Sequence, residues 1–114
     1  MEAMQRVRLM ALVAAGTFLF LGSRARAQNA ATLFKEKCTV CHGENGKGDG
    51  SAAVAYSPRP KDFASPEFWE PSMTEQKIIL TIENGHVDMP PLDQNPAQAK
   101  ALAAYLSSRF KPKQ

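Results

Sequence analysis

The stretch Cys38-Thr39-Val40-Cys41-His42 is the most informative part of this sequence, and it contains the only two cysteines of the chain. C-x-x-C-H is the attachment sequence of a c-type haem, because each thiol can add to one of the two vinyl groups of the macrocycle. The histidine after the second thiol then lies under the ring and can give a nitrogen to the iron. The sequence therefore predicts one thioether-linked haem c per chain, bound by Cys38, Cys41 and His42.

Other roles of a C-x-x-C pair fit the rest of the sequence less well. A thioredoxin-type redox couple belongs in a βαβ unit, and no such pattern is present. A closed zinc site uses four ligands, and the chain has no second C-x-x-C or H-x3-H pair. A structural disulfide between the two thiols is a further alternative. The histidine directly after the pair favours haem over all three.

The first 27 residues look like an export signal. Arg6 and Arg8 precede Leu9–Gly22, a run of 14 residues without a charge, and Ala25-Arg26-Ala27 offers small residues to a signal peptidase. The alternative is a retained membrane anchor, but 14 residues of helix span only about 21 Å at roughly 1.5 Å per residue. A hydrocarbon core is about 30 Å thick. We therefore expect cleavage after Ala27, a periplasmic location, and a single domain over residues 28–114.

Removal of residues 1–27 changes the charge of the chain. It takes away four of the 14 basic residues and one of the 11 acidic residues, which leaves ten of each and a formal net charge of zero. Nothing in this balance indicates binding to nucleic acid or to an anionic membrane surface. The remaining 87 residues (114 minus 27) form a domain too small to bury a large core, so an apolar cofactor would supply part of it.

Apolar periodicity predicts three helices. The first runs from Asn29 or Ala30 to about Thr39 and presents Phe34 on its apolar face. The second is predicted to begin near Ser72, because Ser72-Met73-Thr74-Glu75 matches a capping box, and to end at Gly85 in a left-handed conformation.

The third predicted helix has the clearest boundaries. Asn95 can cap it, Pro96 suits its first position, and Gln98 can complete a capping box. Pro112 is expected to end the run. We expect Phe34 of the first helix to meet Tyr105 of the third, with Leu102 and Leu106 packing nearby.

Residues 43–71 read as a long loop. Residues 43–50 hold four glycines, residues 51–57 allow one helical turn, and Pro58-Arg59-Pro60 follows. A structureless loop of this length is unusual inside a compact domain, unless it wraps a cofactor. A phosphate-binding role is disfavoured because the Gly-Lys-Ser/Thr ending of a P-loop and a preceding strand are both missing.

The second axial ligand of the iron has three candidates, namely Met89, His86 and Met73. Met89 is favoured because Pro90 biases it away from helix and the Pro90-Pro91 pair lowers the entropy of holding a loop against the ring. His86 is the main alternative, since imidazole binds iron well. Met73 lies in the first turn of a predicted helix and is more typical of core. A His/Met pair would raise the reduction potential.

Taken together, these segments resemble a bacterial class I cytochrome c over nearly all of residues 28–114. The matching stretches are Cys38–Gly43, Gly46–Gly50, Pro58–Phe63, Ile82–Gly85, Met89-Pro90 and Ala101–Leu106. The resemblance implies an all-α cytochrome c fold of three to five helices around one haem, with the first and last helices crossing. It also implies that His42 is the proximal ligand and Met89 the distal one. The family commonly has glycine where this chain has Ala30, which implies a slightly wider crossing.

The expected function is that of a periplasmic electron carrier rather than an enzyme. Two protein ligands on the iron leave one-electron exchange as its chemistry. The alternatives are a haem subunit of a larger periplasmic dehydrogenase or oxidase complex, a small haem peroxidase with an open distal site, and a non-haem metal-binding module. The expected partners are a redox donor and a redox acceptor, with no nucleic acid and no stable insertion of the mature chain into a membrane.

Overall fold

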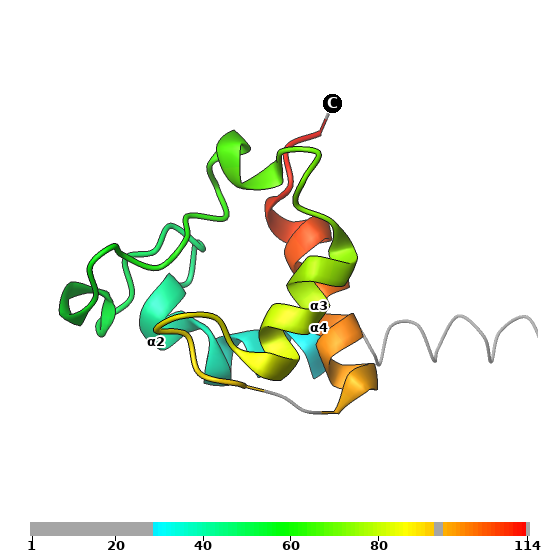
Figure 1. Cartoon of the computed structure of the whole chain (residues 1–114), viewed down its shortest axis with the longest axis horizontal. Helices are drawn as coiled ribbons and strands as arrows, with labels where there is room; N and C mark the ends of the chain where they lie inside the picture. Colours follow the sequence, from blue (N-terminus) through cyan, green and yellow to red (C-terminus); the bar gives the residue numbers. More distant parts are fainter. Residues whose placement is uncertain (1–28, 93–94, 114) are drawn as a thin grey trace, which may run out of the picture.

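The computed structural model describes residues 29–92 and 95–113, and these form helices joined by loops (Figure 1). A first helix covers residues 29–37 and is followed by the short α2, Thr39–His42. Two 3-10 turns come next, η1 at Ala53–Ala55 and η2 at Pro66–Trp69. The chain then forms α3, Glu75–Asn84, and α4, Pro96–Phe110. The described residues contain no β-strand, so the prediction of an all-α fold is confirmed. The predicted signal peptide lies outside the described residues.

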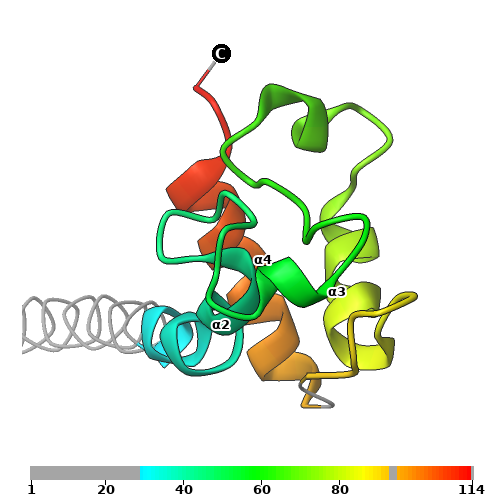
Figure 2. The same cartoon turned by 90° about the vertical axis from the view of Figure 1, so that its left-hand side faces the viewer.

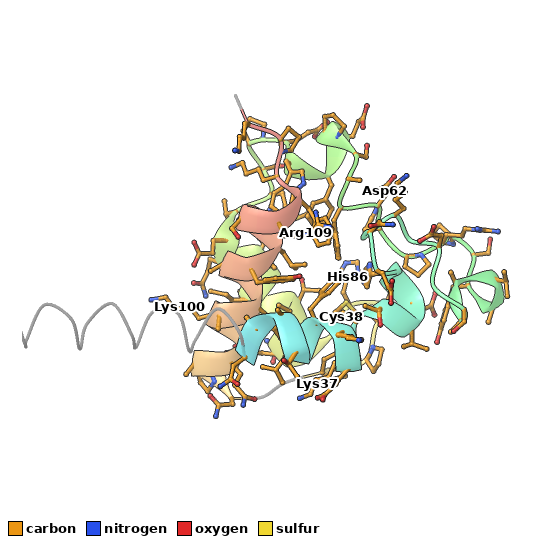
Figure 3. The ribbon with its side chains drawn as sticks, turned by 180° about the vertical axis from the view of Figure 1, so that it is seen from behind. Lys37, Cys38, Asp62, His86, Lys100 and Arg109 are labelled. Carbon is orange, nitrogen blue, oxygen red and sulfur yellow. The ribbon has the colours of Figure 1, made fainter. Side chains whose placement is uncertain are left out.

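The first helix crosses α4, as Figure 3 shows, and aromatic side chains fill the crossing. The ring of Phe34 lies 5.4 Å from that of Tyr105 and 5.5 Å from that of Phe110 between centroids. Leu102 and Leu106 belong to the same buried cluster. The predicted contact between Phe34 and Tyr105 is therefore confirmed. Ala30, which stands where related sequences commonly have glycine, is also buried, so the crossing accepts its methyl group.

The second predicted helix begins two residues later than the capping box indicated. The amide of Met73 donates to the carbonyl oxygen of Glu70 at 2.8 Å, which places Ser72 inside a turn. The N-cap is Thr74, whose hydroxyl accepts from the amide of Lys77 at 3.3 Å. The predicted cap at Ser72 is thus wrong, because Ser72 lies inside the turn that the bond between Met73 and Glu70 closes.

Helix α3 packs against α4 and ends where the sequence predicted. Ile78 and Ile82 are buried in the cluster that also holds Leu102. Gly85 closes the helix with φ 77° and ψ 176°, a region of backbone space that is essentially restricted to glycine. The positive φ was predicted, but ψ is extended rather than helical, so the chain leaves α3 along a straighter path than an ordinary left-handed cap gives.

The predicted ends of α4 agree with the structure. The side-chain oxygen of Asn95 accepts from the amides of Ala97 and Gln98, and Pro96 is the first helical residue. At the other end Lys111 is extended, as expected for a residue before proline. The first half of the interior loop also contains the single helical turn predicted for residues 51–57, which is η1.

The crossing of the first helix with α4 can be tested by truncating Phe34, which is 3% exposed. Phe34→Ala should lower the free energy of unfolding by about 3–5 kcal/mol, because it removes buried contacts and leaves a cavity. Chemical denaturation of the haem-loaded protein measures this change. Val54→Ala, at a side chain that is 77% exposed, is the control and should change stability by less than about 0.5 kcal/mol. Equal effects of the two variants would contradict the packing described above.

Candidate functional site

Cys38, Cys41 and His42 are brought together by the junction between the first helix and α2. The amide of Cys38 still donates to the carbonyl oxygen of Phe34 at 2.9 Å, and the carbonyl oxygen of Cys38 in turn accepts from the amide of His42 at 2.9 Å. Cys38 and His42 are buried, and Cys41 is half-buried. Burial raises the pKa of the Cys38 thiol to about 11 against the opposing charge of Lys37, so this thiol is neutral.

The short helix α2 is held in place by residues 43–50, which we call the glycine loop, and by Ala52. Their amides donate to the last carbonyl groups of the helix, from Gly48 to His42 at 2.8 Å, from Gly50 to Cys41 at 3.1 Å, and from Ala52 to Val40 at 2.8 Å. The loop therefore packs back on α2. A Cβ atom on Gly50 would lie 2.4 Å from the carbonyl oxygen of Val40, so only glycine allows this approach.

The imidazole of His42 is oriented by a backbone carbonyl group. Its Nδ1 lies 3.0 Å from the carbonyl oxygen of Lys61. A carbonyl oxygen can only accept, so Nδ1 carries the hydrogen and Nε2 keeps a free lone pair. Burial lowers the pKa of His42 below its ordinary value, while the hydrogen bond to Lys61 partly opposes that shift. The result is a neutral imidazole with one nitrogen able to bind a metal, which is the form that metal ligation requires.

One face of the same imidazole is covered by an aromatic ring. Phe63 stacks on His42 with a centroid distance of 4.4 Å and an interplanar angle of 18°. The backbone of Phe63 is held on both sides, because its amide donates to the carbonyl oxygen of Gly46 at 2.6 Å and its carbonyl oxygen accepts from Nε1 of Trp69 at 2.8 Å. Residues 61–63 therefore contact both an edge and a face of the His42 ring.

Met89 lies in a tight turn after α3. His86 and Met89 exchange two backbone hydrogen bonds, of 2.9 and 2.8 Å, and form an isolated antiparallel bridge. Directly opposed residues of an antiparallel pair point their side chains to the same face, so His86 and Met89 share one face of the turn. Met89 is half-buried and His86 exposed. Val87 closes the turn with φ 48°, which is strained for a β-branched residue.

Two further hydrogen bonds fix the segment that follows this turn. The amide of Leu92 donates to the carbonyl oxygen of Ile82 in α3 at 2.9 Å. The carbonyl oxygen of Leu92 accepts from Nζ of Lys37 in the first helix at 3.4 Å. Lys37 directly precedes Cys38, so the side chain that anchors this segment comes from the residue next to the first thiol.

The two groups of candidate ligands occupy different parts of the molecule. Figure 2 shows α2, which carries Cys41 and His42, on one side of the view and the segment after α3, which carries Met89, on the other. In Figure 3, which looks along a different direction, the labelled His86 and Cys38 overlap in projection. Met73, the third candidate distal ligand, packs instead against the buried core cluster, as core methionines do.

The available donors suit a haem better than a lone metal ion. Within residues 29–92 and 95–113, no three His, Cys, Asp or Glu side chains gather closely enough to hold a metal. Cys38 lies in the buried cluster that also holds Phe34 and Ile78, and Phe63 of that cluster stacks on His42. Two cysteines in C-x-x-C-H spacing, a neutral imidazole and a thioether match the attachment and ligation of a haem. No helix in the described part of the chain is long and apolar enough to cross a membrane.

The contacts of Lys61 and Phe63 with His42 were not predicted from the sequence. The carbonyl oxygen that orients His42 belongs to the backbone of Lys61, and a backbone acceptor has no residue signature. Phe63 was visible only as the end of the Pro58–Phe63 stretch, where nothing linked it to His42. A sequence signal was available in the prolines before it, which restrict the path of the chain toward α2.

Two comparisons with known proteins bear on the identity of the chain. The family model for cytochrome c matches residues 27–109. The chain is also 32% identical over 85 residues to the Cbb3-type cytochrome c oxidase subunit FixP of Bradyrhizobium sp. (strain ORS 278). That match covers 72% of this chain but only 27% of the relative, so the chain spans about a quarter of the length of the curated protein.

The strain at Val87 leads to a stability prediction. Asn adopts a left-handed conformation more readily than a β-branched residue, which pays about 1–2 kcal/mol there. Val87→Asn should therefore raise the free energy of unfolding of the haem-loaded protein by about 1 kcal/mol, as measured by chemical denaturation. Val54→Asn is the matched control, because Val54 is similarly exposed but has no positive φ. An unchanged or lower stability of Val87→Asn would show that the strained turn does not persist in solution.

Proposed function

The chain belongs to the cytochrome c family and carries covalently bound haem c, and on that premise we propose that it is a periplasmic one-electron carrier. We further propose that His42 and Met89 are the two axial ligands of its iron. When bound, the haem supplies reversible one-electron exchange between the ferric and ferrous states. Cys38 and Cys41 would hold the ring through two thioether bonds.

The observation that carries this proposal is the state of His42. The residue follows Cys41 directly, is 9% exposed, and donates from Nδ1 to the carbonyl oxygen of Lys61. Such a hydrogen bond from the second nitrogen fixes the tautomer and increases the basicity of the ligating nitrogen. Met89 is a neutral, soft ligand that favours the ferrous state and therefore a higher potential. The tight turn and the anchor at Leu92 restrict where its thioether can go.

A carrier is favoured over a peroxidase because two protein ligands would leave no position on the iron for a substrate. The side chains of His86 and Met89 share one face of their turn, so an imidazole stands next to the thioether. We assign ligation to Met89 because it is half-buried, whereas His86 is exposed. This proposal also makes the protein a partner of two redox proteins, one donor and one acceptor, and not an enzyme.

A second candidate function is that of a haem subunit in a larger oxidase complex. It is supported by the similarity to the FixP subunit of a cbb3-type oxidase, although the chain matches only 27% of that protein. Gel filtration of a native periplasmic extract, followed by haem detection, separates the two functions. A free carrier elutes at its own mass, and a subunit elutes with its complex. Mass spectrometry of the purified protein would test the proposed cleavage after Ala27.

Covalent attachment at Cys38 and Cys41 makes a direct chemical prediction. The Cys38→Ala/Cys41→Ala double variant should release its haem completely into acidified acetone, and each single variant should retain at most one thioether bond. Val40→Ala lies in the same motif and should keep the haem fully attached. Haem that resisted extraction in the double variant would rule out attachment at these two residues.

The distal ligand can be identified by paired substitutions in one turn. Met89→Ala should lower the reduction potential, allow carbon monoxide to bind the ferrous form, and abolish the weak sulfur-to-iron band at the red end of the ferric spectrum. His86→Ala is the matched control and should leave the band and the potential nearly unchanged. If His86→Ala removes low-spin character while Met89→Ala does not, the ligand is the imidazole. Ready binding of carbon monoxide by the unsubstituted ferrous protein would favour the peroxidase.

A further inference from the structure

The plane of the His42 ring needs more than one contact to be fixed. The torsion that turns a histidine ring, χ2, is broad and has no sharp rotamer. The hydrogen bond from Nδ1 to Lys61 restrains that torsion from one edge, but a carbonyl oxygen accepts over a wide range of directions. A flat group against the face of the ring supplies the missing restraint. Phe63 is that group, at 4.4 Å and 18° from coplanar.

The position of Phe63 is itself fixed by several contacts, so its ring can restrain the orientation of the His42 imidazole. Its ring is 6% exposed and meets Phe68 edge-on at 4.9 Å and Phe110 of α4 at 5.9 Å. Its backbone is bonded to Gly46 in the glycine loop and to the indole nitrogen of Trp69 in η2. Three separate elements therefore fix its position.

We propose that Phe63 is a positioning residue that sets the plane in which the imidazole of His42 meets the iron. This inference rests on the proposed function, because it takes His42 as the proximal ligand. The stacked ring also excludes water from that face of the imidazole. An apolar, closed surrounding disfavours the more highly charged ferric state, so Phe63 should help to keep the potential high. A phenylalanine that only filled the core would have neither effect.

The test compares substitutions in one aromatic cluster of the haem-loaded protein. Phe63→Leu keeps an apolar side chain but removes the flat ring, Phe63→Tyr keeps the ring, and Phe68→Leu removes a ring that packs on Phe63. Electron paramagnetic resonance of the ferric form reports the orientation of the imidazole through the g values, and a redox titration gives the potential. Phe63→Leu should shift or broaden the g values and lower the potential. Phe63→Tyr should keep the g values of the parent. Phe68→Leu should cost stability but shift the g values much less than Phe63→Leu, because the ring stacked on His42 remains.

If the Phe63→Leu protein does not fold and cannot be purified, a second variant provides the test. Trp69→Phe keeps an aromatic ring but loses the hydrogen bond to the Phe63 carbonyl oxygen, so it should shift the g values in the same direction by a smaller amount. The inference is overturned if Phe63→Leu, or Trp69→Phe in its place, has the g values and potential of the parent. It is also overturned if Phe68→Leu moves them as far as Phe63→Leu.

The spectrum of the unsubstituted protein distinguishes a failure of this inference from a failure of the proposed function. If the parent is not a low-spin haem protein with a histidine ligand, the proposed ligation is wrong and Phe63 has no ligand to position. If the parent is low-spin and its variants at Phe63 and Trp69 are unshifted, the ligation stands and only the positioning role is lost.

Discussion

The hydrogen bonds between the glycine loop and the carbonyl groups of α2 are the constraint on which the rest of the site depends. A helix of four residues has no stability of its own, because nucleation costs more than so few hydrogen bonds return. Thr39–His42 keeps its shape because Gly48 and Gly50 satisfy carbonyl groups that would otherwise face solvent or an apolar core. The glycines are required by space, since a Cβ atom at Gly50 would overlap the backbone of α2.

The same loop determines what surrounds the imidazole. Once the loop has returned to α2, the amide of Phe63 bonds to Gly46 and brings residues 61–63 against His42. The surroundings of His42 are therefore built from a loop with little regular structure, and their rigidity comes from hydrogen bonds and aromatic contacts. Trp69 extends this network into η2. An extended segment of this kind is stable only because few of its polar backbone groups are left without partners.

The turn that carries Met89 has separate anchors. The segment after α3 is fixed to α3 through Ile82 and to the first helix through Lys37, and neither contact involves the glycine loop. Between these anchors, the turn at Val87 adopts a backbone conformation that is unfavourable for its side chain. Strain of this kind persists where the surrounding structure over-determines the chain, and it tends to gather near functional residues.

Local patterns in the sequence determined the all-α fold, the C-x-x-C-H motif at Cys38–His42 and both ends of α4, because each depends on residues within about four positions of one another. The N-cap of α3 is Thr74, two residues after the predicted Ser72, because a turn closed by the bond between Met73 and Glu70 includes Ser72. Only the tertiary structure decided that the Lys61 carbonyl group and the Phe63 ring meet His42. These contacts join positions about 20 residues apart through a loop, and one of them uses a backbone oxygen that every residue possesses.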